Sequence, residues 1–325
     1  MSARRIGILG TALASILLLS AAARAQEVTL SAINFLPHNV DYGAVWMKWI
    51  EEVNAAGKGK LKIEVRPFGS IPQMNIGDAV RSGVVDMSNV PPAFYSRLLP
   101  WADGIKLATV SHADMHKNGA EAWINEQHNK IGIEYLTTWG WGDTFVWYMR
   151  DKPVTSIEGF KGLKIRGTPI YRAFLGALGA EMISTPTSEI TSILERGVVD
   201  GFGWTSLSIK DQGWSKYVKY RIEPGFYTPN VSIIANLNKW RSLPEDVRNL
   251  LKDKAIELAT EYPEKYGKAA TARARQQVID EGVEIIELKG AEAETYLKTA
   301  QDAGWAEIEK LDPVNGPKLR SLISR

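Results

Sequence analysis

The sequence predicts an α/β fold with two similar lobes, and three features of the 325-residue chain support this. The sequence Gly-Val-Val-Asp follows a helix-like segment twice, within residues 81–89 and 195–204, and its glycine should end the helix each time. Strand-like and helix-like patterns alternate along most of the chain, as they do in proteins with parallel sheets. A helical pattern at residues 242–282 is far longer than an average helix, and Pro263 should kink it.

The expected strands are apolar runs or alternations bounded by glycine and proline. They cover residues 28–35, 61–65, 131–136, 145–150, 163–166, 230–237 and 283–288. Val84-Val85 and Val198-Val199 should open two more. The strand at 230–237 is expected to cross back into the first lobe.

The expected helices have apolar residues three or four positions apart, or begin at a capping residue. They cover residues 40–53, 75–82, 113–130, 171–178, 185–196, 242–282 and 291–311, with a short helix after Ser156. Gly83 and Gly197 should end their helices in the left-handed conformation. Trp46 and Trp49 lie on one helix face and are expected in the core.

The amino end differs from the rest of the chain. Arg4 and Arg5 precede an uncharged run at residues 6–23, and Ala23-Arg24-Ala25 forms a small-x-small cleavage site. This pattern predicts a secretory signal peptide over residues 1–25, and therefore a free, soluble protein in the periplasm.

Charge and cysteine content exclude several classes of function. Removing the three arginines of the leader changes the formal net charge from +2 to −1, which is too little positive charge for a nucleic-acid binder. The chain has no cysteine, which excludes disulfides, thiol catalysis, thiolate metal sites and a lipid-anchored cysteine.

Arg166 is the leading candidate for ligand binding. It ends an expected strand just before Gly167-Thr168-Pro169, at the edge of the sheet where α/β proteins bind ligands. A guanidinium held there can bind a carboxylate through two parallel hydrogen bonds, which a lysine cannot reproduce. The alternative is an ion-paired surface arginine. Arg150, at the start of the crossover into the second lobe, is a weaker candidate on the same reasoning.

Aromatic and histidine side chains allow two interpretations each. Four tryptophans at strand ends or glycine turns should either line a cavity or fill the seam between the lobes, and these are Trp139, Trp141, Trp147 and Trp204. His112 and His116 have the spacing of metal ligands on a helix, although a solvated helix start explains them better.

The order of motifs resembles the solute-binding proteins of tripartite ATP-independent periplasmic (TRAP) transporters, of the DctP type. The resemblance covers the mature chain and is carried by Asn34-Phe35, Gly83-Val84-Val85-Asp86, Arg150 before Asp151-Lys152-Pro153-Val154, the run from Phe160 to Arg166, Ser188-Glu189 and Val199-Asp200-Gly201. It implies a two-lobed periplasmic binding protein fold, type II-like, with a hinge and a long kinked helix spanning both lobes. The implied lobes are residues 26–147 plus about 236–271, and 148–235 plus about 272–325.

The resemblance also implies a site. Arg166 would bind the ligand carboxylate and Arg150 would support it. The other candidate pocket residues are Asn34, Phe35, Asn89, Trp139, Trp141, Thr187 and Trp204. Pro91 stands where sialic-acid binders have a glutamate, and Gly203 where metal-assisted keto-acid binders have one, which argues against sialic acid and against a metal-bridged keto acid without excluding them. No metal, cofactor or catalytic residue is expected.

The expected function is therefore capture of an organic acid, with aromatic and hydroxy acids among the candidates, and its delivery to the small and large membrane subunits of a TRAP transporter. Two alternatives stay open. The chain could serve an ATP-driven importer, or it could be an exported hydrolase using Asp143 or His38, although it contains no nucleophile or nucleotide-binding motif.

Overall fold

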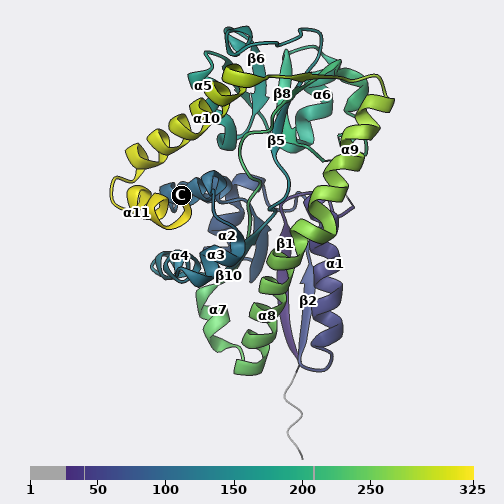
Figure 1. The fold of residues 1–325 in the computed structure, drawn as a ribbon. Helices are drawn as coiled ribbons and strands as arrows, with labels where there is room; N and C mark the ends of the chain where they lie inside the picture. Colours follow the sequence, from purple (N-terminus) through teal and green to yellow (C-terminus); the bar gives the residue numbers. More distant parts are fainter. Residues whose placement is uncertain (1–26, 40, 208) are drawn as a thin grey trace, which may run out of the picture.

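The computed structural model describes residues 27–39, 41–207 and 209–325, so the expected signal peptide lies outside the described residues. The chain forms two α/β lobes, one above the other in Figure 1. Each lobe is built on one sheet, with five strands in the first and six in the second. The predicted two-lobed α/β fold is confirmed.

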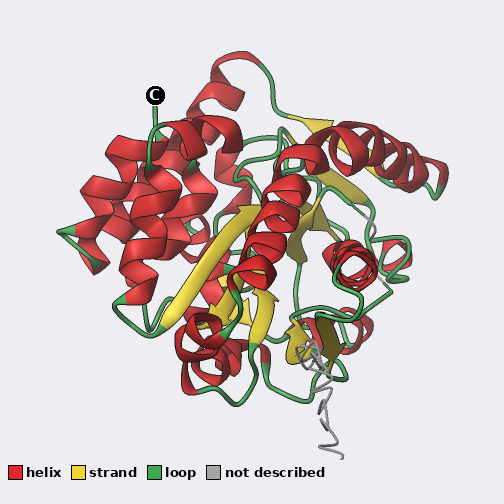
Figure 2. Ribbon diagram, turned by 90° about the horizontal axis from the view of Figure 1, so that it is seen from below, coloured by secondary structure: helices red, strands yellow, loops and turns green. Residues whose placement is uncertain are grey.

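The sheet of the first lobe has the order β2-β1-β3-β10-β4. The parallel strands β1 (Val28–Asn34), β2 (Leu61–Val65) and β3 (Met87–Val90) are joined by α1 (Asp41–Ala56) and α2 (Ile76–Ser82). As predicted, β10 (Val231–Asn236) returns to this lobe, where it runs antiparallel between β3 and β4 (Ile133–Trp139). Figure 2 looks at this lobe from below and shows helices around its strands.

The sheet of the second lobe has the order β11-β9-β5-β8-β6-β7. Its strands are β5 (Phe145–Met149), β6 (Lys164–Gly167), β7 (Glu181–Ser184), β8 (Gly201–Thr205), β9 (Tyr220–Glu223) and β11 (Glu284–Glu287). β6 lies between β7 and β8 and is parallel to both. The sequence did not predict β7 and β9, because neither is a continuous apolar run.

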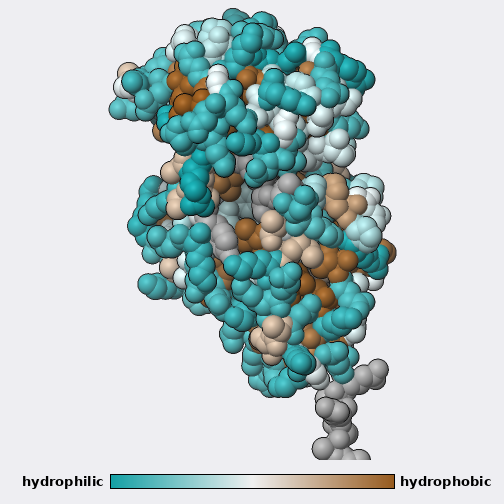
Figure 3. Space-filling model, turned by 90° about the vertical axis from the view of Figure 1, so that its right-hand side faces the viewer, coloured by the Kyte–Doolittle hydropathy of each residue, from teal (hydrophilic) through white to brown (hydrophobic). Residues whose placement is uncertain are grey.

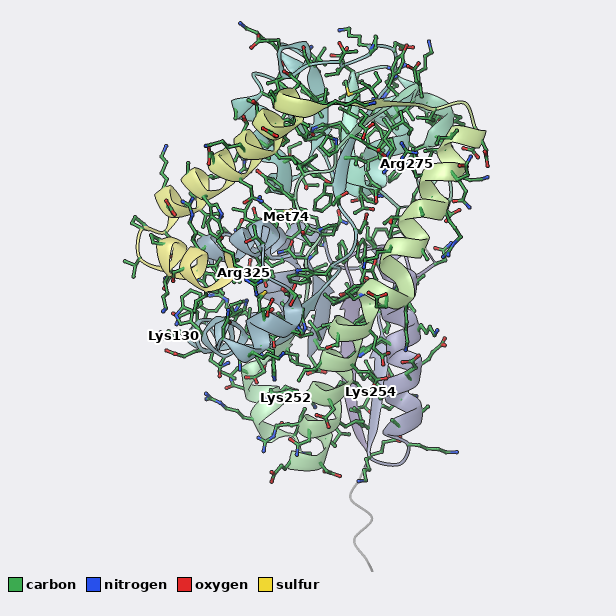
Figure 4. All side chains as sticks on the ribbon, viewed as in Figure 1. Met74, Lys130, Lys252, Lys254, Arg275 and Arg325 are labelled. Atoms are coloured by element: carbon green, nitrogen blue, oxygen red, sulfur yellow. The ribbon has the colours of Figure 1, made fainter. Side chains whose placement is uncertain are left out.

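One long helical rod joins the lobes. It consists of α8 (Glu245–Tyr262), a π-helical turn at Pro263–Gly267 and α9 (Lys268–Asp280), which confirms the predicted kink. α8 packs on β4 and α1 of the first lobe, and α9 continues along the second lobe (Figure 1). Figure 4 shows Arg275 on α9, where its Nε donates to the carboxylate of Glu223 on β9 at 3.0 Å.

The C-terminal helices also contact both lobes. α10 (Gly290–Leu311) packs on α5 (Arg172–Ala177) of the second lobe and on the 3-10 segment Pro100–Leu107 of the first. α11 (Asn315–Ile323), which the sequence did not predict, packs on the same segment. The predicted lobe boundaries, which assign residues 272–325 to the second lobe, stay a prediction.

Two local predictions were wrong. Gly83 and Gly197 do end their helices with positive φ, at 78° and 66°. The valines that follow them do not open strands, since Val84 and Val198 are 54% and 45% exposed. The chain needs a further turn after each glycine, and the strands begin at Met87 and Gly201.

The segment at residues 113–130, which was expected to be one helix, forms two. α3 (His112–Lys117) and α4 (Ala120–Asn129) are separated by Gly119, whose φ is 82°. Trp46 and Trp49 on α1 were predicted to lie in the core, and they do: their rings are buried and stack with centroids 4.5 Å apart. Within the described ranges, no helix combines the length and the apolar character that a membrane span requires.

Candidate functional site

A small cavity lies between the lobes. Its volume is about 50 Å³. It is lined by Phe35, Leu36, Tyr42, Pro91, Phe94, Phe145, Thr168, Ile170, Tyr171, Thr187, Trp204, Thr205, Pro229, Asn230 and Val231. One water molecule occupies roughly 30 Å³ in the liquid, so the lobes must part or side chains must move before an organic acid can enter.

A larger hollow of about 400 Å³ adjoins this cavity and shares Phe94 and Thr168 with it. Met74, labelled at the junction of the lobes in Figure 4, is part of its wall. The space-filling view in Figure 3 shows the molecule narrowing between the lobes, with apolar side chains exposed among hydrophilic ones on that face. The inner cavity thus lies next to a wider hollow at the seam between the lobes.

Arg166 lies on β6, beside these two hollows, and is fully buried. One guanidinium nitrogen, Nη2, donates to the carbonyl oxygen of Thr185 at 2.6 Å, and Nε lies 3.4 Å from the Thr185 hydroxyl. Nη1 is buried and has no hydrogen-bond partner among the described residues. No carboxylate of the described chain lies within ion-pair distance of this guanidinium. Arg166 itself does not line either hollow, but Thr168, two residues further along the same extended segment, lines both.

Burial lowers the pKa of Arg166 to about 10, and the nearby Tyr171 and Glu189 oppose this shift. The guanidinium is therefore charged at neutral pH. A buried cation without a counter-ion is costly, and the binding of an anion offsets that cost.

Three of the other predicted site residues line the inner cavity, namely Phe35, Thr187 and Trp204. Three more lie beneath it in a chain of hydrogen bonds within the first lobe. Trp139 Nε1 donates to Asn89 Oδ1 at 3.0 Å, and Asn89 Nδ2 donates to Asn34 Oδ1 at 3.3 Å. Asn34, Asn89 and Trp139 are not among the lining residues, so they support the wall of the cavity and do not form it.

The structure does not bring Arg150 or Trp141 to the cavity. The Arg150 guanidinium lies against Gly197, where an added Cβ would be 2.8 Å from Nη1. This is the opposite end of β5 from the cavity, because Met149 pairs with Gly201 at the start of β8 while Phe145 pairs with Thr205 at its end.

Trp141 and Trp147 both pack away from the cavity. Trp141 is half-buried and packs edge-on against His112, with ring centroids 5.9 Å apart. Trp147 is buried in the second lobe, where its ring stacks on Phe226 at 4.6 Å. Of the four tryptophans at strand ends and turns, only Trp204 therefore lines the cavity.

Sequence reasoning missed several residues that connect the two lobes across the cleft. Gln73 Nε2 donates to the Phe35 carbonyl oxygen at 2.7 Å and to the Thr187 hydroxyl at 3.3 Å. Lys106 Nζ donates to the carbonyl oxygen of Ile170 at 2.7 Å. These contacts join segments 64 and 114 residues apart, so no local pattern could have indicated them.

A buried carboxylate ties the lobes together at the hinge. Asp143 Oδ2 accepts a hydrogen bond from the Tyr42 hydroxyl at 2.9 Å, and Oδ1 accepts from the hydroxyl of Ser206 and from the Thr144 backbone N–H at 2.7 Å. Tyr42 belongs to α1 of the first lobe, and Ser206 follows β8 of the second. Burial raises the pKa of Asp143 to about 6, although these hydrogen bonds and the charge of Arg221 act in the opposite direction.

This shift predicts a pH dependence of stability. Asp143 binds its proton more tightly in the folded chain than in the unfolded one, so the free energy of unfolding should fall as the pH rises from about 4 to about 6. At about 1.4 kcal/mol for each pKa unit, the fall amounts to about 3 kcal/mol at most. Urea titrations of the wild type and Asp143→Asn at pH 4.5, 5.5 and 7 measure it. The difference between the two proteins should change with pH, and two parallel stability profiles would contradict the prediction.

His112 is buried, contrary to the expectation of a solvated helix start. Its Nε2 lies 2.8 Å from Glu121 Oε1, and His116 Nδ1 lies 2.9 Å from Glu121 Oε2. The carboxylate of Glu121 thus contacts both histidine rings. In the described part of the chain, no group of three or more His, Cys, Asp or Glu side chains has the arrangement of a metal site.

Comparison with known proteins agrees with this architecture. Residues 33–311 match the family model of bacterial extracellular solute-binding protein, family 7 (DctP). A monocarboxylate 2-oxoacid-binding periplasmic protein of Nostoc sp. is 23% identical over 226 residues, which are 65% of this chain and 62% of that protein, so the match spans less than two thirds of the relative.

Two solved structures share the fold over nearly their whole length. A TRAP periplasmic solute-binding protein of Desulfovibrio salexigens with bound orotic acid has a TM-score of 0.81 and 19% identity, covering 91% of this chain and 97% of that one. A Bordetella pertussis extracytoplasmic solute receptor that binds pyroglutamic acid has a TM-score of 0.79 and 19% identity, covering 92% and 100%. The fold, the inter-lobe cavity and the family match lead to one conclusion: the chain belongs to family 7 of the bacterial extracellular solute-binding proteins, the DctP family.

Proposed function

We propose that this protein captures an organic acid in the cavity between its lobes, with Arg166 binding the carboxylate, and delivers it to the membrane subunits of a TRAP transporter. Two TRAP-type proteins of the same fold support this, since one holds orotic acid and the other binds pyroglutamic acid. The observation that carries the proposal is the buried Arg166 guanidinium, which has a free Nη1 and no acidic partner among the described residues.

The ligand carboxylate takes the place of the missing counter-ion. Two hydrogen bonds from a guanidinium to a carboxylate are stronger once the closed lobes exclude water. For a micromolar ligand the net free energy is about 8 kcal/mol, which has to include hinge closure and desolvation. The contacts of Gln73 with Thr187 and of Lys106 with Ile170 then hold the lobes together, so that closure accompanies binding.

The walls of the cavity favour an apolar ligand body. Phe35, Phe94, Phe145 and Trp204 are all buried and all line the cavity. Flat rings of this kind pack against a cyclic or aromatic body, and burial of apolar surface contributes roughly 25 cal/mol per Å². Arg150, which lies at the far end of β5, has no part in the proposed site.

A thermal-shift screen of the secreted protein tests the function. The panel consists of mono-, di-, keto-, hydroxy- and aromatic acids, with the matching amides as controls that lack the charge. A ligand at one hundred times its Kd should raise the free energy of unfolding by about 2.7 kcal/mol, and its amide should not.

The screen also separates the alternatives. Acids that stabilise the protein and return chemically unchanged support a binding protein, whereas turnover of a stabilising ligand would favour an exported hydrolase. Two membrane-subunit genes beside this one support the TRAP assignment, and an adjacent ATPase gene would instead support an ATP-driven importer. Stabilisation by amides as strong as that by acids would contradict the role given to Arg166.

A further inference from the structure

Three buried polar groups that line the cavity lack a hydrogen-bond partner among the described residues. They are the hydroxyls of Thr168 and Thr205 and the amide nitrogen Nδ2 of Asn230. All three side chains belong to residues that are at least nine-tenths buried. An unpaired polar group in such a place costs free energy, so a ligand that pairs with it gains affinity.

These groups stand at two ends of the cavity. Thr168 follows β6 and lies on the side of Arg166. Thr205 is the last residue of β8, where it pairs with Phe145 of β5. Asn230 comes from the segment that leaves the second lobe beside β5, because the backbone N–H of Phe145 donates to the carbonyl oxygen of Tyr227 at 3.1 Å.

The strand order β5-β8-β6 sets the distance between the two ends. One strand spacing, about 5 Å, separates β6 from β8, which carries Thr205, and two spacings, about 10 Å, separate β6 from β5, beside which the Asn230 segment lies. Trp204 precedes Thr205 on the middle strand and also lines the cavity. The cavity therefore has Arg166 beside one end, an aromatic wall, and a polar end at Thr205 and Asn230.

The second polar end carries no charge. None of the residues that line the inner cavity is Lys, Arg, His, Asp or Glu. A second carboxylate placed there would be buried without a cation, and an ammonium would be buried without an anion, and both are unfavourable. The Asn230 amide nitrogen can only donate, and the Thr205 hydroxyl can also donate. A carbonyl oxygen has two lone pairs and can accept both hydrogen bonds.

We infer that the ligand is a compact, ring-like monocarboxylate with an uncharged acceptor, a carbonyl above all, at the end away from its carboxylate, and that Asn230 and Thr205 bind this acceptor. The inference rests on the proposed function, since Arg166 must hold the carboxylate. It adds the specificity: plain monocarboxylates lack the second contact, and dicarboxylates place a charge where the protein supplies no counter-charge.

Matched ligand series test this by isothermal titration calorimetry. One series is cyclohexanecarboxylate, 4-oxocyclohexanecarboxylate and trans-cyclohexane-1,4-dicarboxylate, and the second consists of cyclopentanecarboxylate, 3-oxocyclopentanecarboxylate and cyclopentane-1,3-dicarboxylate. In at least one series, the oxo acid should bind at least tenfold more tightly than both of its partners, because the acceptor satisfies groups that are otherwise left unpaired.

Variants assign the contact. Asn230→Ala should weaken binding of the oxo acid at least fivefold and leave the plain acid within twofold, so the ratio of the two affinities measures the contact. Thr205→Val keeps the side-chain shape, removes the hydroxyl and should act in the same direction, which provides a second test if Asn230→Ala folds poorly. Asn238→Ala, on the exposed face of α7 (Leu237–Ser242), is the control and should change neither affinity.

The inference is overturned if a dicarboxylate or a plain acid binds best in both series, if no oxo acid binds, or if Asn230→Ala weakens plain and oxo acids equally. The proposed function fails differently. Any carboxylate that binds the wild type and not an Arg166 variant upholds that function, even where these series refute the acceptor site.

Discussion

Arg166→Lys is expected to lower the affinity for the carboxylate ligand by at least tenfold, which is about 1.4 kcal/mol, while the fold is retained. Lysine keeps the positive charge but loses the planar fork that forms two parallel hydrogen bonds. It also loses the support of Thr185, whose carbonyl oxygen accepts from Nη2 and fixes the guanidinium on β6. Calorimetric titration with the strongest ligand of the thermal-shift screen measures the loss.

Arg166→Met sharpens this test. Methionine retains the apolar stem and removes the charge, so binding should become undetectable. The ligand-free variant should unfold at the same denaturant concentration as the wild type or at a higher one, because a buried cation without a counter-ion has been removed. A purely structural arginine would give the opposite result, a clear loss of stability. Arg196→Lys, on an exposed position after α6 (Ile190–Glu195), serves as the control. Wild-type affinity in Arg166→Lys would count heavily against the proposed site.

Lys106→Met is expected to lower the free energy of unfolding by about 3 to 5 kcal/mol. Lys106 is 1% exposed, and its Nζ donates to Asp103 Oδ2 at 2.5 Å. Without the lysine, the carboxylate of Asp103 stays buried with no cation, because its other oxygen already lacks a partner among the described residues. Urea denaturation of the ligand-free protein measures the effect.

Two further variants show where the effect comes from. The double variant Lys106→Met with Asp103→Leu removes both charges and should recover most of the lost stability. Lys60→Met breaks the exposed ion pair with Asp246, whose side chains are 63% and 54% exposed, and should change stability by less than about 0.5 kcal/mol. If Lys106→Met and Lys60→Met were equally mild, the buried pair would not have the importance that its burial indicates.

Lys106 also connects stability with ligand capture. Its ammonium donates to the carbonyl oxygen of Ile170, a residue of the second lobe that lines the inner cavity. In the Lys106→Met variant, closure loses one contact between the lobes. Its ligand affinity should therefore fall even under conditions in which the protein is fully folded.

The elements that local pattern alone specifies were predicted well. The alternation of apolar and charged residues at Leu61–Val65 and the proline at position 263 led to the correct strand and the correct kink. The two Gly-Val-Val-Asp segments were assigned to the right helix ends but to the wrong strand starts. A glycine can end a helix in the left-handed conformation because it lacks a Cβ, and this depends on that residue alone. The residue at which a strand begins depends instead on where the neighbouring strand of the sheet lies.

The candidate site was predicted in part for the same reason. Arg166 could be identified because it ends its own strand, and the family resemblance added Thr187 and Trp204, which do line the cavity. Arg150 was misplaced, since a strand sequence does not show which of its ends faces the partner lobe. The direction of β5 against β8 decides that, and it points Arg150 away from the cavity.

By itself, the sequence determined the two-lobed α/β class, the long kinked rod and the single arginine at the end of β6, because each depends on neighbouring residues along the chain. Only the tertiary structure decided that this arginine is buried with no acidic partner among the described residues, that Lys106 and Gln73 reach across the cleft, and that Asn230 and Thr205 line one cavity. These are contacts between distant segments, and their partners are set by the packing of two lobes rather than by any local pattern.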